Sequence, residues 1–250
     1  MRYCGIAVGR KHHHLCAIDE ARTDEPPIKL PATFFEPGSA ERVVAQLQAL
    51  GPVVVAVDGP LSDPAGEQSH RVCDEELARR GVTPNVPSDG ARALCEGLRP
   101  LGIFKGGRLP DAEGAQGPAT GDQGLEGDID TGVFQTTPVF ETNSEGVFCA
   151  LQGRRVPARR HPLGVQVRIE ELAHDQVLDE SGDLWNRRIE EIEAAAAALC
   201  AHRYAVGHAC WAGDPAEGVI VLPGSQLPET FSTEGVLPPV LRAPLPGGRP

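Results

Sequence analysis

The most constraining feature of this chain is a short, unbroken apolar run, VVVAV, at residues 53–57. It is rich in β-branched residues and ends abruptly at Asp58-Gly59-Pro60. A strand that is apolar at every position is buried on both faces, as in the centre of a parallel sheet that helices cover on both sides. The run therefore predicts an α/β fold with this strand near its middle.

The segments around this strand predict the remaining elements. Residues 3–8 and 15–18 flank a turn and read as a hairpin, and residues 28–35 supply a third antiparallel strand, which Pro31 favours at a sheet edge. The other expected elements are helices at 39–50, 67–80, 91–98, 146–151, 165–174 and 184–204, a strand at 138–141 and a hairpin over 206–222. A three-strand meander followed by alternating helices and strands predicts an RNase H-like mixed sheet, with antiparallel and parallel strands and helices on both faces.

The length of 250 residues and the apolar fraction of 40% suit one domain with a substantial core. We expect this domain to span residues 1–223. Within it, residues 106–132 are rich in glycine and acidic residues, which is typical of a flexible surface loop. Residues 224–250 are rich in proline and are expected to form a flexible tail.

The net charge of −12 argues against a general nucleic-acid binder. No apolar stretch reaches the ~18 residues of a membrane span, and the start of the chain does not resemble a signal peptide. The seven cysteines include no CxxC pair, which excludes a zinc ribbon and is typical of buried thiols in a reducing compartment. We therefore expect a cytoplasmic protein that does not enter a membrane.

Four acidic residues are candidates for chemistry. Asp58 and Glu141 each follow a predicted strand, where a cleft can open in an α/β sheet. Glu190 and Glu193 are three residues apart in a predicted helix and so reach the same face. Each also has a structural interpretation: Asp58 can cap a turn, Glu141 can lie exposed on an edge, and the helix acids can complement the helix dipole.

Carboxylates that meet in a dry cleft repel one another, and a divalent cation relieves that repulsion. We therefore expect Asp58, Glu141, Glu190 and Glu193 to be able to hold Mg²⁺ or Mn²⁺, which activates a water molecule against phosphate. Residues 146–169 contain no acid but several bases, which form a candidate contact surface for a phosphodiester backbone. These candidate substrate-binding residues are Arg154, Arg155, Arg159, Arg160 and Arg168. Alternatively, this stretch is a solvated loop that pairs with the acidic loop at 106–132.

Several segments together resemble domain-of-unknown-function family 429, a family of predicted nucleases with an RNase H-like fold. The matching segments are VAVDGPLS at 55–62, RVCD at 71–74, LARRG at 77–81, VFETNSE at 139–145, LQG at 151–153, PLG at 162–164, EEIEAA at 190–195 and GDPAEGVIVLP at 213–223. Each motif is weak by itself, but their order over residues 3–223 is specific. The resemblance implies a metal-dependent nuclease with Asp58, Glu141 and Glu193 as catalytic residues.

The chain departs from this family pattern at two positions. Ala7 stands where the family has an acid on its first strand, and Glu193 stands where the family has the shorter aspartate. His14, which begins the second strand, is a candidate replacement ligand. The first hypothesis is therefore a metal-dependent nuclease or phosphodiesterase with reduced activity. The alternative is a catalytically silent protein that binds nucleic acid or nucleotide, or serves as a scaffold. An actin-like phosphotransferase ranks last, because the glycine-rich phosphate loops are missing.

Overall fold

The computed structural model describes residues 1–20, 28–62, 70–101 and 137–234. Its centre is an eight-stranded sheet in the order β6-β3-β2-β1-β4-β5-β8-β7. The strands are β1 (Arg2–Ala7), β2 (His14–Asp19), β3 (Leu30–Phe34), β4 (Val54–Asp58), β5 (Val139–Thr142), β6 (Val177–Asp179), β7 (Ala209–Asp214) and β8 (Gly218–Pro223).

The strand directions identify the fold. Strands β1, β4, β5 and β8 are parallel to their neighbours in this series, whereas β2 is antiparallel to both β1 and β3. The core order β3-β2-β1-β4-β5 with one antiparallel strand is the RNase H-like arrangement, so the predicted fold class is confirmed. The buried strand predicted at 53–57 corresponds to β4 in the middle of the sheet, which begins at Val54, whereas Val53 precedes it and is exposed.

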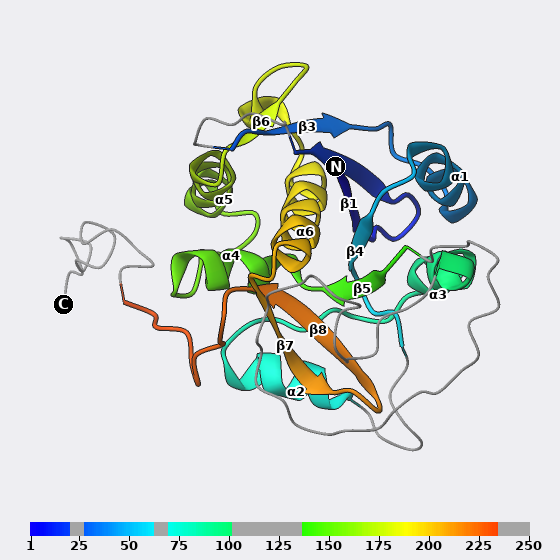
Figure 1. The fold of residues 1–250 in the computed structure, drawn as a ribbon. Helices are drawn as coiled ribbons and strands as arrows, with labels where there is room; N and C mark the ends of the chain where they lie inside the picture. The colour runs from blue at the N-terminus through cyan, green and yellow to red at the C-terminus, as the bar shows by residue number, and fades with distance from the viewer. Residues whose placement is uncertain (21–27, 63–69, 102–136, 235–250) are drawn as a thin grey trace, which may run out of the picture.

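Helices cover both faces of the sheet (Figure 1). They are α1 (Ala40–Leu50), α2 (Val72–Arg79), α3 (Asp89–Leu98), α4 (Ser144–Gln152), α5 (Pro162–His174) and α6 (Ile189–Ala205), with short 3-10 helices at Arg99–Leu101 and Leu184–Asn186. Helix α6 crosses the centre of one face with α4 and α5 beside it, and α1 and α3 lie on the opposite face (Figure 1). Two buried clusters correspond to these two faces.

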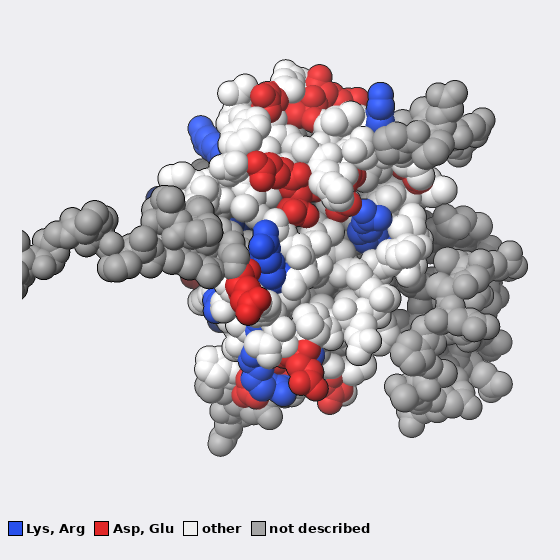
Figure 2. All heavy atoms as spheres, turned by 90° about the vertical axis from the view of Figure 1, so that its left-hand side faces the viewer, with Lys and Arg blue, Asp and Glu red and all other residues white. Residues whose placement is uncertain are grey.

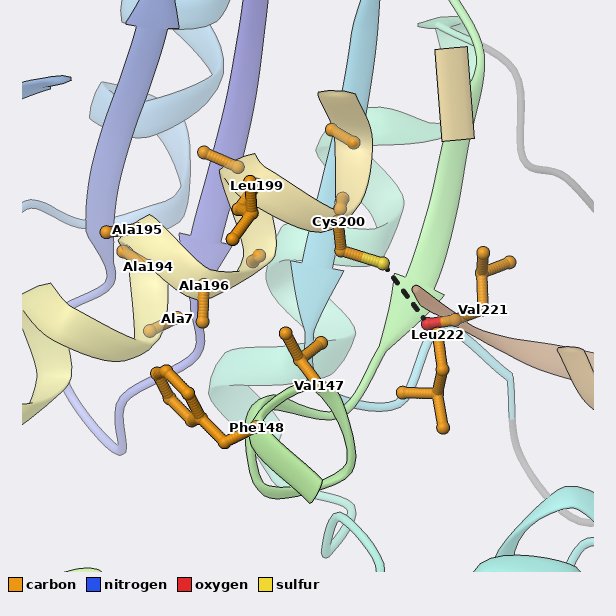
Figure 3. Packing of buried hydrophobic residues seen from close by; sticks show 14 of the residues in the cluster. Ala7, Val147, Phe148, Ala194, Ala195, Ala196, Leu199, Cys200, Val221 and Leu222 are labelled. Atoms are coloured by element: carbon orange, nitrogen blue, oxygen red, sulfur yellow. Dashed lines mark hydrogen bonds between the residues drawn. The ribbon is translucent and has the colours of Figure 1, made fainter. Parts of the chain in front are cut away.

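The alanine run of α6 allows the helix to lie very close to β1. Residues 192–202 of α6 are all buried. A Cβ atom added to Gly5 would be only 2.1 Å from the Ala198 backbone nitrogen, so no larger residue fits at that position. Figure 3 shows Ala7 among the same buried side chains as Ala194 and Phe148. The first strand thus ends against apolar groups of α4 and α6.

The structure corrects two sequence expectations about the elements. Strand β3 is not an edge strand, because β6, which was not predicted, pairs with it. This pairing uses the N–H of Leu30 and the carbonyl of Ala32, on either side of Pro31, so the missing donor of the proline has no effect. Helix α6 begins at Ile189, five residues later than expected, because residues 184–186 form a separate turn of 3-10 helix.

Other expectations fall partly or wholly outside the described residues. The acidic loop at 106–132 lies outside them, as do the start of the helix predicted at 67–80 and the end of the tail. The described part of the tail contacts the body of the protein: Phe231 is buried, and the Ser232 carbonyl accepts a hydrogen bond from the Arg155 backbone. Among the described helices, none combines the length and hydrophobicity that a membrane span requires.

Candidate functional site

Four residues form a row across the edge of the sheet where β1, β4 and β5 end. His14 pairs with Ala7, Ala7 with Asp58, and Asp58 with Thr142. Residues paired in this way on neighbouring strands point to the same face of a sheet. The Thr142 hydroxyl lies 3.5 Å from the Cys200 thiol of α6, so the whole row faces α6. Within this row Asp58 is the one carboxylate.

Asp58 is held by the beginning of α4. Its Oδ1 accepts a hydrogen bond of 3.0 Å from the Ser144 backbone N–H in the first turn of that helix, where unpaired donors favour an anion. Burial raises the pKa of Asp58, whereas the hydrogen bonds from Ser144 and the charge of Arg159 oppose the rise. The net effect is a raised pKa, so this site favours the charged form of Asp58 less than water does.

Glu193 lies close enough to Asp58 for the two charges to interact. Burial, followed by the negative charge of Asp58, raises the pKa of Glu193 to about 7. Glu190 lies one turn earlier on α6, and both glutamates contact Arg159 from the loop between α4 and α5. Asp58, Glu190 and Glu193 are hereafter called the acid cluster, and Arg159 is the base that contacts it.

Glu141 is not part of the acid cluster, so the expectation that it shares one crevice with Asp58 and Glu193 is wrong. In the sheet Glu141 pairs with Val57, whereas the next residue, Thr142, pairs with Asp58. Side chains alternate between the two faces along a strand. Because Thr142 faces α6, Glu141 points to the opposite face.

The Glu141 carboxylate belongs to a separate buried network with Arg71 and Asp74, two residues that were not among the candidates from the sequence. Arg71 donates to both of its oxygens, at 2.6 and 2.7 Å, and to both oxygens of Asp74, at 2.8 Å each. The Leu61 backbone N–H donates to Glu141 as well, at 2.9 Å. Hydrogen bonds to the two carboxylates raise the pKa of Arg71 despite its desolvation. In the sequence, the i, i+3 spacing of Arg71 and Asp74 at the start of α2 is the feature that could have indicated this ion pair.

The predicted basic stretch divides into buried and exposed arginines. Arg168 is buried, and its guanidinium donates to the carbonyls of Pro157 and Gly164, so the expected substrate contact does not fit this residue. Arg154 and Arg160 are exposed and Arg155 is half-exposed. No ion pair joins these three to any acid in the described ranges.

The surface around this loop is mixed in charge. Figure 2 shows the face that carries α5, where basic and acidic side chains alternate and do not gather into one continuous basic area. The exposed arginines can therefore contact only a few phosphate groups. Strong nonspecific binding requires a longer basic surface.

The acids do not form a divalent metal site in this structure. Among the described residues, no three His, Cys, Asp or Glu side chains converge closely enough to hold an ion. Ala7 provides no ligand, Glu141 is on the other face, and both oxygens of Glu193 accept hydrogen bonds from Arg159. In the part of the chain that the structure describes, the buried Nδ1 of His14 has no hydrogen-bond partner, and His14 belongs to no converging group of ligands. The residues present thus do not fit Mg²⁺ or Mn²⁺.

No protein-family model matches the chain, and no curated protein matches it. The resemblance to family 429 therefore depends on the motifs themselves. Among solved structures the chain is similar to Thermus thermophilus RuvC, at 15% identity over 83% of this chain and 97% of that chain, with a TM-score of 0.42. It is also similar to T. thermophilus RuvC in complex with a Holliday junction substrate, at 16% identity over the same shares, with a TM-score of 0.39. The RNase H-like fold is assigned here from the order and directions of the strands.

Proposed function

We propose that this chain is an RNase H-like protein that binds nucleic acid without hydrolysing it. The observation that carries this proposal is the row at the end of the central strands, in which Ala7 lies between His14 and Asp58. Metal-assisted hydrolysis needs several converging ligands around an ion that positions and activates water. The row contains one carboxylate, Asp58, and the nearby Glu193 is already paired with Arg159, so the site supplies too few metal ligands.

The binding part of the proposal is based on the loop between α4 and α5. Its Arg154, Arg155 and Arg160 have no acidic partner among the described residues, although the chain has a net charge of −12. Guanidinium groups bind phosphate in a bidentate manner, and contacts of this kind do not depend on base sequence. The loop thus suits a short stretch of nucleic-acid backbone.

The test is a fluorescence-anisotropy titration with labelled single-stranded DNA, duplex DNA and RNA at low salt. About three phosphate contacts predict a slope of roughly −3 in a plot of log affinity against log salt for duplex DNA. We expect the double variant Arg155→Glu/Arg160→Glu to weaken binding at least about tenfold. The matched control is Arg42→Glu, an exposed arginine on α1 at the opposite face, which should change affinity less than about twofold. Equal losses in both variants, or no binding to any of the three probes, contradict the proposal.

A metal-dependent nuclease that uses Asp58, Glu141 and Glu193 is the second candidate. The proximity of Asp58 and Glu193 favours it, because the first raises the pKa of the second and a divalent cation would relieve their repulsion. Incubating the same probes with Mg²⁺ or Mn²⁺ decides between the two. The proposed function predicts intact probes after a long incubation, whereas cleavage that Asp58→Asn abolishes supports the nuclease.

A further inference from the structure

We propose that the guanidinium of Arg159 is the resident cation of the acid cluster and that it keeps divalent metal ions out. This inference deepens the proposed function, because it says what occupies the place where hydrolysis would require a metal. It concerns Asp58, Glu190 and Glu193, which carry up to three negative charges on the α6 side of the sheet.

Arg159 donates hydrogen bonds to two of the three members of the acid cluster. Its Nε and Nη2 donate to the two carboxylate oxygens of Glu193, and Nη2 also donates to Glu190 Oε1 at 3.2 Å. The negative charges of Glu193, Glu190 and Asp58 all raise the pKa of Arg159. A bidentate arginine occupies both oxygens that Glu193 would otherwise present to an ion.

The loop that carries Arg159 is fixed by the buried Arg168. The Arg168 guanidinium donates to the Pro157 carbonyl at 2.9 Å and to the Gly164 carbonyl at 2.8 Å, and so joins the loop to α5. Gly164 lies so close to the loop that an added Cβ would be 2.1 Å from the Ala158 carbonyl oxygen. Arg168 is therefore a positioning residue, which holds the backbone on both sides of Arg159.

Removal of Arg159 would leave the cluster without its counter-charge. Glu193 is mostly buried, with 9% of its side chain exposed, so water can compensate its charge only weakly. Carboxylates forced together in such a site are relieved by a divalent cation. A variant that lacks the guanidinium should therefore recover stability when Mn²⁺ is added, and the wild-type protein should not.

The experiment measures Mn²⁺ binding by electron paramagnetic resonance and the melting temperature with and without Mn²⁺. Wild-type protein should bind no Mn²⁺ below millimolar concentration and show no thermal shift. Arg159→Gln should melt at a lower temperature, bind one Mn²⁺ at least about tenfold more tightly than wild type, and regain part of the lost melting temperature. Arg159→Lys keeps the charge but cannot occupy both oxygens of Glu193 at once, so its affinity for Mn²⁺ should lie between those of the wild type and Arg159→Gln. Arg160→Gln, which changes an exposed neighbour, should match the wild type in Mn²⁺ affinity and melting temperature.

Tight Mn²⁺ binding by the wild-type protein overturns the inference, whether or not Arg159→Gln folds. It is equally overturned if Arg159→Gln folds and gains no affinity for Mn²⁺, or if Arg160→Gln gains as much. All these measurements are made without nucleic acid. A failure of the proposed nucleic-acid binding is therefore distinguishable from a failure of this inference.

Discussion

Ala7 ends β1 in the row that also contains Asp58, and its methyl group packs with Ala194 and Phe148. We expect Ala7→Asp to lower the free energy of unfolding by about 3 kcal/mol or more, because it buries a second carboxylate beside Asp58. The neutral variant Ala7→Asn has nearly the same shape and should lose clearly less. Urea denaturation at pH 8 measures both. Equal losses would show that the charge at this position is compensated in a way the present structure does not contain.

On the other face of the sheet, the buried charge of Glu141 allows a second prediction about stability. Glu141→Gln removes a charge that pairs with the buried Arg71, which leaves the guanidinium with Asp74 as its remaining ionic partner. Loss of one partner from a buried pair costs about 3–5 kcal/mol, so the free energy of unfolding should fall by roughly that amount. Asp58→Asn, which reduces repulsion with Glu193, should change it much less. Denaturant titrations of both variants test this contrast, and a neutral effect of Glu141→Gln would contradict the described network.

The packing of α6 on β1 is the clearest determinant of stability at the scale of elements. Gly5→Ala would place a Cβ atom 2.1 Å from the Ala198 nitrogen and 2.2 Å from the Ala194 oxygen, so the helix must move away from the strand. We expect a loss of about 3 kcal/mol and a clearly lower melting temperature. Gly182→Ala is the control, because no atom of the described residues lies within 4 Å of its added Cβ atom. Similar melting temperatures for the two variants would mean that α6 does not lie as close to β1 as described.

The elements were largely predictable because their signals are local. The β-branched run at 53–57 indicated a buried strand, and residues 54–57 of β4 are buried. The helix predicted at 39–50 is α1, which Ser39 caps at its N-terminus and Gly51 at its C-terminus. β6 has only three residues and exists because it pairs with β3, which no local pattern encodes. The start of α6 was misplaced because acids and alanines favour a helix without fixing its first residue.

The site was less predictable because it depends on single-residue register and on long-range pairing. The predicted strand ended at Glu141, but β5 continues to Thr142, and a shift of one residue moves a side chain to the other face. The pairing of Arg159 with Glu193, 34 positions away, depends on how α5 packs against α6. Asp58 and Glu193 are close enough for their charges to interact, but no hydrogen bond joins them among the described residues.

At the scale of the whole molecule, buried histidines predict a dependence of stability on pH. Burial lowers the pKa of His202, which packs edge-on against Tyr3 and has no hydrogen-bond partner on either ring nitrogen among the described residues. Because the folded-state pKa is below the unfolded value, this histidine stabilises the fold fully above about pH 6.5. That contribution is lost as the pH falls, because the unfolded chain binds the proton first.

The variant His202→Phe keeps an aromatic ring but removes the titration. As the pH falls from about 7 to about 5, the wild type should lose stability that the variant keeps. The free energy of unfolding of His202→Phe should therefore rise relative to that of the wild type over this range. Urea denaturation of both proteins at several pH values measures this difference. His208→Phe, at an exposed position, is the control and should show no such trend. A constant difference between His202→Phe and the wild type over this range would contradict the assignment.

We have proposed that Arg159, and not a metal ion, neutralises the acid cluster. The most direct test is an anomalous-difference map from crystals of the wild-type protein grown with Mn²⁺. We expect continuous density for the guanidinium against Glu193 and no anomalous peak between Asp58 and Glu193. A manganese peak at that position, with Arg159 turned away, would contradict it.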